Sequence, residues 1–150
     1  MGKDIAMSEQ AILHDLVSSW VSLGLEFAAG APGVSALYIY VSSERGSIFA
    51  NVYYEQDGIV TFPDDLVGAK TSSERVGQLH DFQFEDLLRA ERQFAEENVP
   101  APTEYKIYYE PATRKLDVQL SRDLIYANDL DKIPERGIEY WLGDRAPKLF

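Results

Sequence analysis

The chain has 150 residues, with 25 acidic and 14 basic side chains and a formal net charge of −11. This length fits one domain spanning residues 1–150. The charge disfavours nucleic acid and anionic membranes as partners, and it is explained equally well by solubility and by attraction to basic proteins. The absence of cysteine excludes disulfides, thiolate metal sites and cysteine nucleophiles. Residues 1–8 lack the features of a signal peptide, and no apolar stretch is long enough to cross a bilayer, so we expect a cytoplasmic location.

The first predicted element is an amphipathic helix. Ser8 is a favourable N-cap. Apolar residues then recur at spacings of three and four, at Leu13, Leu16, Trp20, Leu23 and Phe27. Polar side chains occupy the opposite side, so one face is expected in the core. Residues 30–33, Gly-Ala-Pro-Gly, end the helix.

Three short strands are predicted next, at residues 34–41, 48–55 and 59–62, because these stretches are rich in β-branched and aromatic side chains. Residues 43–46 and 56–58 are turn sequences, and the second contains Asp-Gly, a strong hairpin signal. The connections are too short for parallel crossovers, so the strands form an antiparallel meander.

A second helix is predicted after a loop at residues 64–79, which has no clear period. Asp81 is its expected N-cap, and the helix runs to about Glu97. Its expected apolar face consists of Phe84, Leu87, Leu88, Ala90 and Phe94.

The clearest alternation of apolar and polar residues in the chain follows, at residues 105–110 and 115–121, with a turn at 110–113. It predicts a second hairpin with one buried and one wet face, and it places Tyr108 on the wet face. Pro134 opens a last short helix that Gly143 closes, and Ile138 and Trp141 are expected to dock on the body.

The resulting order, αβββαββα, predicts an α+β fold. We expect a single domain with an antiparallel sheet of about five strands and helices packed mainly on one face.

Few residues suggest catalysis. His80 stands beside Asp81, and an enzyme hypothesis would begin with these two residues and Asp64. A histidine near a helix cap is the more common situation, and neither histidine of the chain has metal-ligand spacing. We therefore expect no catalytic residues, no metal and no cofactor. The tyrosines on the strands, set among carboxylates, favour a protein-binding face instead.

The chain resembles the YezG-like immunity proteins, which are small acidic antitoxins of bacterial polymorphic and contact-dependent growth inhibition toxin systems. The resemblance covers most of the chain as a pattern of elements and aromatic residues. It is carried by Leu37-Tyr38-Ile39-Tyr40, residues 48–54, Phe94-Ala95-Glu96-Glu97-Asn98, Tyr105-Lys106-Ile107-Tyr108-Tyr109-Glu110 and Ile138-Glu139-Tyr140-Trp141-Leu142-Gly143. Arg114-Lys115 stands where family members often have Gly-Lys.

The resemblance implies an immunity protein that is not an enzyme and that binds one cognate toxin, often a basic nuclease, and blocks its active site or substrate groove. The local density of carboxylates and aromatics selects the expected partner-binding residues, Tyr108, Asp117, Asp123, Tyr126, Asp129, Asp131 and Glu135. The alternative is a non-enzymatic regulatory interaction or adaptor domain, homodimeric through an open sheet edge.

Overall fold

The computed structural model describes residues 2–149, and the side chains of residues 8–149. Its helices are α1 (Gly2–Phe27), α2 (Ser73–Glu96) and α3 (Gly137–Leu142), with short 3-10 turns at Pro63–Asp65, Pro134–Arg136 and Gly143–Arg145. Its strands are β1 (Val34–Glu44), β2 (Ser47–Gln56), β3 (Ile59–Thr61), β4 (Glu104–Glu110) and β5 (Lys115–Ser121). The predicted α+β class and the order αβββαββα are confirmed.

All five strands form one antiparallel sheet in the order β3-β2-β1-β4-β5. Its first two hairpins have tight turns in which both central residues have positive φ. Arg45 and Gly46 (49° and 82°) join β1 to β2, and Asp57 and Gly58 (51° and 83°) join β2 to β3. Turns of this kind match the twist of the flanking strands, so the Asp-Gly signal is confirmed. The central strand β1 is paired on both sides.

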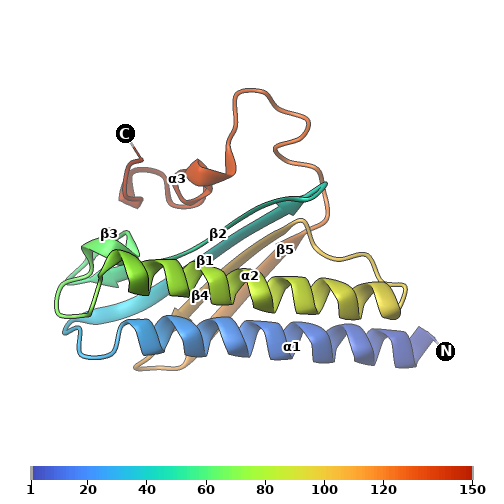
Figure 1. Cartoon of the computed structure of the whole chain (residues 1–150), viewed down its shortest axis with the longest axis horizontal. Coiled ribbons are helices and arrows are strands. Elements are labelled where there is room, and N and C mark those ends of the chain that lie inside the picture. Colours follow the sequence, from blue (N-terminus) through green and yellow to red (C-terminus); the bar gives the residue numbers. More distant parts are fainter. Residues whose placement is uncertain (1, 150) are drawn as a thin grey trace.

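The helices α1 and α2 lie side by side on one face of the sheet (Figure 1). Trp20 of α1 is fully buried there, and its ring meets that of Tyr105 edge-on at 5.1 Å. The hydroxyl of Tyr54 donates a hydrogen bond to the carbonyl oxygen of Gly24, at 2.7 Å. A Cβ at Gly24 would lie 2.7 Å from Leu37 Cδ2, so this glycine lets α1 approach β1 closely.

Tyrosines dominate the opposite face of the sheet. Tyr38, Tyr40 and Tyr53 are buried there under residues 122–149, which we call the C-terminal segment. This segment crosses above the sheet on the side away from α1 and α2 (Figure 1). Ile138 is 1% exposed in this layer, and the rings of Trp141 and Tyr38 lie 5.4 Å apart, so the predicted docking of the last helix is confirmed.

The starts of both long helices differ from the predictions. The helix α1 begins at Gly2, so Ser8 lies inside it and is not its N-cap. The helix α2 begins at Ser73, because the Ser72 hydroxyl accepts a hydrogen bond from the Arg75 backbone N–H at 3.2 Å. Residues 73–79, predicted as loop, are therefore helical.

The core face of α2 also differs from its prediction. Its buried residues are Leu79, Gln83, Leu87, Ala90 and Phe94. Gln83 is 0% exposed, whereas Leu88, predicted to face the core, is 44% exposed. Because Gln83 is polar, the buried residues of α2 do not form a continuous apolar stripe, and the helical period is not apparent in the sequence.

Strand β5 corrects the prediction of one buried and one wet face for the second hairpin. Tyr105 and Ile107 of β4 are fully buried, but Leu116 and Val118 of β5 remain 49% and 37% exposed. These two residues lie on the face that the helices cover elsewhere, since they pair with Tyr109 and Ile107. The helices do not extend over the outer strand, and β5 is exposed on both faces along most of its length.

Candidate functional site

A buried carboxylate anchors the start of the C-terminal segment. Glu44, the last residue of β1, is 5% exposed. Its two carboxylate oxygens accept hydrogen bonds from the backbone N–H groups of Ile125 at 2.9 Å, Tyr126 at 3.1 and 3.2 Å, and Ala127 at 2.9 Å. Three consecutive N–H donors on one charged acceptor fix the direction of the chain at this point.

A chain of hydroxyl groups adds a second attachment. The buried Tyr40 donates to Glu104 Oε2 at 2.6 Å and forms a short hydrogen bond with the Tyr126 hydroxyl. Burial raises the pKa of Tyr40, and burial also raises the pKa of Tyr126 to about 12. Both phenols therefore keep their protons at neutral pH. Since Tyr40 gives its single proton to Glu104, Tyr126 must be the donor to Tyr40.

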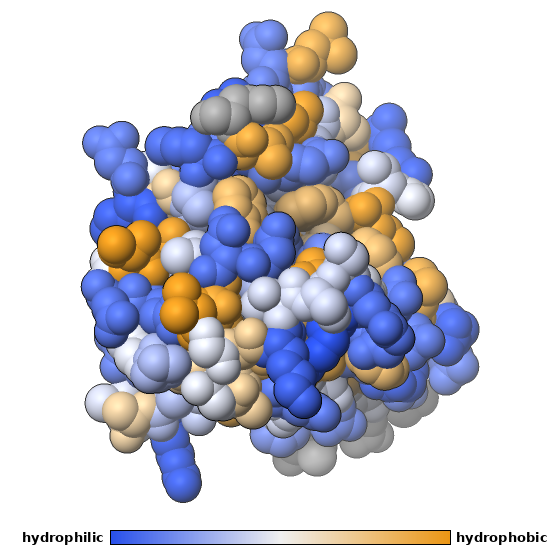
Figure 2. All heavy atoms as spheres, turned by 60° about the vertical axis from the view of Figure 1, so that its left-hand side comes forward, coloured by the Kyte–Doolittle hydropathy of each residue, from blue (hydrophilic) through white to orange (hydrophobic). Residues whose placement is uncertain are grey.

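Beyond these attachments the segment forms an exposed loop, residues 127–135, which we call the tip loop. Leu130 is 101% exposed at its tip, between Asp129 and Asp131. The Asp131 backbone N–H donates to Asp129 Oδ1 at 2.9 Å, which tightens the turn. Hydrophobic and hydrophilic atoms protrude together at the top of the molecule, where the chain after β5 lies (Figure 2).

Aromatic residues support one side of the tip loop. The rings of Tyr126 and Tyr140 lie 6.4 Å apart, and the Lys132 ammonium lies 5.6 Å from the centre of the Tyr140 ring. Tyr140 is 45% exposed and Ile133 is 39% exposed. The loop therefore presents apolar and charged groups together.

The structure brings four of the seven predicted partner-binding residues together. Tyr126, Asp129, Asp131 and Glu135 belong to the tip loop or its base. Asp123 lies where the chain leaves β5, and its carbonyl oxygen accepts a hydrogen bond from Thr103 Oγ1 at 2.6 Å.

The remaining two predicted residues, Tyr108 and Asp117, are cross-strand neighbours in the β4–β5 hairpin. Tyr108 is half-buried and not on an open wet face. Its ring lies 5.1 Å from that of Tyr38, and its hydroxyl donates to Glu110. Tyr108 therefore joins the hairpin to the aromatic layer, while Asp117 is exposed.

The sequence pattern does not single out Leu130, Ile133 and Tyr140, which the structure places in or beside the tip loop. An available signal was Leu130 itself, an apolar residue between two aspartates in a stretch with no helical or strand period. Because Leu130 belongs to no predicted helix or strand face that packs in the core, its side chain is expected to be exposed.

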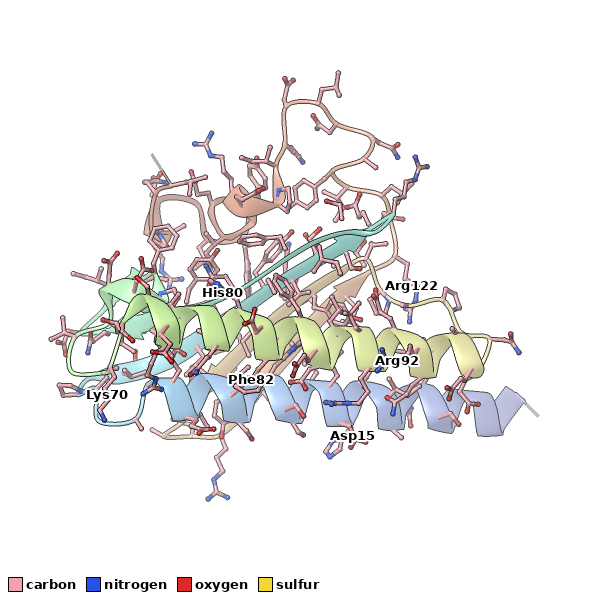
Figure 3. The ribbon with its side chains drawn as sticks, viewed as in Figure 1. Asp15, Lys70, His80, Phe82, Arg92 and Arg122 are labelled. Atoms are coloured by element: carbon pink, nitrogen blue, oxygen red, sulfur yellow. The ribbon has the colours of Figure 1, made fainter. Side chains whose placement is uncertain are left out.

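The residues of the enzyme hypothesis have a different arrangement. His80 points from α2 toward the sheet (Figure 3), where its Nε2 atom lies 3.0 Å from Asn51 Oδ1 of β2. Burial lowers the pKa of His80, and Asp64 and Asp81 oppose this effect. Both aspartates are exposed. The hydrogen-bond partner of the imidazole is thus an amide, not the carboxylate that would orient a general base.

Among residues 8–149, whose side chains the structure describes, no group of three or more histidine, aspartate and glutamate side chains is placed to hold a metal ion. Within residues 2–149, no helix combines the length and apolarity needed to cross a membrane.

No protein-family model matches this chain, and no curated protein matches it.

Proposed function

We propose that this protein is an immunity protein, an antitoxin that binds and neutralises one cognate bacterial toxin domain by blocking its active site or substrate groove. The observation that carries the proposal is the tip loop, in which a fully exposed leucine stands between carboxylates on a firmly anchored base. The resemblance to YezG-like immunity proteins supplies the class of partner, a toxin domain and often a basic nuclease. In this proposal the protein acts in the bacterial cytoplasm and uses no cofactor.

The construction of the tip loop suits inhibition by insertion. Because Glu44 and Tyr40 hold its base, less conformational entropy is lost when a partner binds the tip. Leu130 is the anchor that enters an apolar depression of the partner, as an aliphatic anchor in a pocket does at the centre of an interface. Asp129 and Asp131 meet the basic residues with which a nuclease holds phosphates.

The distribution of charge assigns a separate role to the rest of the molecule. Residues 1–103 hold 16 acidic and 6 basic residues, a net charge of −10, while residues 104–123 hold four of each and residues 124–150 hold five acidic and four basic. Long-range attraction of a basic toxin therefore comes mostly from the helices and the first three strands. The tip loop contributes the short-range contacts.

The test is co-expression with the toxin domain encoded beside this protein in its genome. The expected results are protection of the cells and co-purification of the two proteins as a complex. Cells that die with no complex formed would overturn the proposal.

Two charge-reversal variants then locate the interface. The first replaces three tip-loop carboxylates by lysine, those of Asp129, Asp131 and Glu135. The second makes the same change of net charge on the exposed side of α2, at Asp81, Glu85 and Glu96. The α2 variant is expected to slow association at low salt only, whereas the tip-loop variant also speeds dissociation by about tenfold. Equal dissociation rates for the two variants would show that the tip loop is not the interface.

A further inference from the structure

The two edges of the sheet differ in how they are protected. Strand β3 has three residues, and Pro63 follows it closely, which is how proteins commonly end an edge. Strand β5 has seven residues, Lys115–Ser121, and presents an edge about 24 Å long. Long edges of this kind are templates for pairing with another strand.

The outer strand also has uncovered apolar side chains. Leu116, at 49% exposure, borders a groove between the hairpin and α1, whose other walls include Val21, Leu25 and Tyr109. Val118 lies two residues further along the same face and is 37% exposed. A strand added beside β5 would bring its own side chains against one side of Leu116 and Val118 and would bury part of their apolar surface.

We propose that β5 is a dimer interface, in which two copies of this protein pair their β5 strands antiparallel about a two-fold axis at Val118. The centre of the seven-residue strand is Val118, so this register pairs every residue of the strand. It places Leu116 opposite Leu120 of the second copy, and Val118 opposite itself. The two five-stranded sheets become one continuous sheet, with both pairs of helices on the same side.

Charge favours a second copy over a basic partner at this edge. The two charged residues of β5, Lys115 and Asp117, face Ser121 and Gln119 of the other copy, so no like charges are opposed. The hairpin and its flanks, residues 104–123, are neutral as a whole, with four acidic and four basic residues. The −11 charge of the chain therefore lies away from this interface, and a basic toxin finds little attraction here.

The first test is sedimentation of the purified protein at concentrations from about 1 μM to about 1 mM. A concentration-dependent dimer is expected, and a protein that stays monomeric throughout overturns the proposal. Val118→Lys places two ammonium groups at the axis and should raise the dissociation constant of the dimer at least about tenfold. The matched control is Val67→Lys, because Val67 is 70% exposed in the loop before α2. Equal weakening by both substitutions would overturn the proposal.

A second pair of variants tests the register without touching the apolar face. Gln119 is exposed and faces Asp117 of the other copy in this register. Gln119→Lys should therefore tighten the dimer and Gln119→Glu should loosen it, each by roughly threefold to tenfold, because each change occurs twice about the axis. In the register centred on Asp117, residue 119 would instead face Lys115 and the order of the two variants would reverse. A reversed order, or loosening by both, overturns the proposed register.

Salt separates this proposal from the toxin-binding proposal, because the two interfaces respond in opposite directions. Raising sodium chloride from about 50 mM to about 500 mM screens the repulsion between two acidic copies and should tighten the dimer, while it should weaken binding to a basic toxin. A dimer that dissociates as salt rises would contradict the neutral interface. Loss of toxin binding alone leaves the dimer result unaffected.

Discussion

The backbone of Gly137 lies directly against the ring of Tyr40. A Cβ built at residue 137 would lie 2.2 Å from Tyr40 Cε2 and 2.4 Å from Cζ. Because Tyr40 is fully buried on the tyrosine-rich face, its ring has little room to move. The absence of a side chain at residue 137 thus allows the start of α3 to settle on the sheet.

The first prediction concerns this contact. Gly137→Ala should lower the free energy of unfolding by about 1–3 kcal/mol, because overpacking displaces the segment from the sheet. Urea denaturation measures the change. The control is Gly77→Ala in α2, where a Cβ would meet no atom within 4 Å and where alanine should stabilise the helix by about 0.5–1 kcal/mol. Destabilisation by both substitutions would show that the Tyr40 contact is not the cause.

The second prediction concerns the buried amide of Gln83. Its side-chain oxygen and nitrogen are buried without a hydrogen-bond partner among the described residues. Gln83→Met keeps a similar shape and removes these polar atoms, so the free energy of unfolding should rise by about 1–3 kcal/mol. The same substitution at the exposed Gln78 should change it by less than about 0.5 kcal/mol. A loss of stability at residue 83 would mean that the amide has a partner in solution.

The third prediction concerns pH and His80. Burial lowers the pKa of His80 in the folded protein below the ordinary value of 6.5. As the pH falls through that value, the unfolded chain binds a proton at this residue before the folded chain does, so stability decreases toward acid. His80→Gln should therefore lose less stability than the wild type between about pH 7.5 and about pH 5.5. His14→Gln, which alters an exposed histidine, is the control and should follow the wild type.

The fourth prediction separates binding from folding at Leu130. Because this side chain is fully exposed, Leu130→Ala should change the free energy of unfolding by less than about 0.5 kcal/mol. The same substitution should weaken binding of the cognate toxin by about tenfold or more, as expected for a central anchor. Calorimetry measures both quantities. Val67→Ala shortens another exposed apolar side chain, and an equal loss of affinity there would contradict a special role for Leu130.

The features of the fold that the sequence predicted depend on local chemistry. Asp57-Gly58 specifies its turn through backbone conformation alone. The apolar positions Tyr105 and Ile107, with Lys106 between them, correctly indicate which residues of β4 are buried. The α2 start was missed because Gln83 interrupts the apolar stripe. The exposure of Leu116 was missed because alternation cannot show whether a helix extends over an outer strand.

The candidate site could be predicted only in part, because a local sequence pattern does not show which residues a distant segment covers. Carboxylate density selected Asp129 and Asp131, which the structure brings together with Tyr126. It also selected Tyr108, whose ring is occupied by a contact with Tyr38. A tyrosine on a strand is exposed or buried according to whether the C-terminal segment covers it. That segment is distant in sequence, so the local pattern of residues around the tyrosine cannot predict its burial.

The choice of tyrosine for one face of the sheet has a consequence during synthesis. Every strand is complete at Ser121, whereas the cover for that face follows in residues 122–149. At synthesis rates of about 5–20 residues per second, residues 122–149 are added within roughly one to six seconds after Ser121. Phenol hydroxyls remain hydrated during that interval, as leucine or valine side chains would not. Because Tyr38, Tyr40 and Tyr53 form this face, the sheet is less prone to aggregate before residues 122–149 cover it.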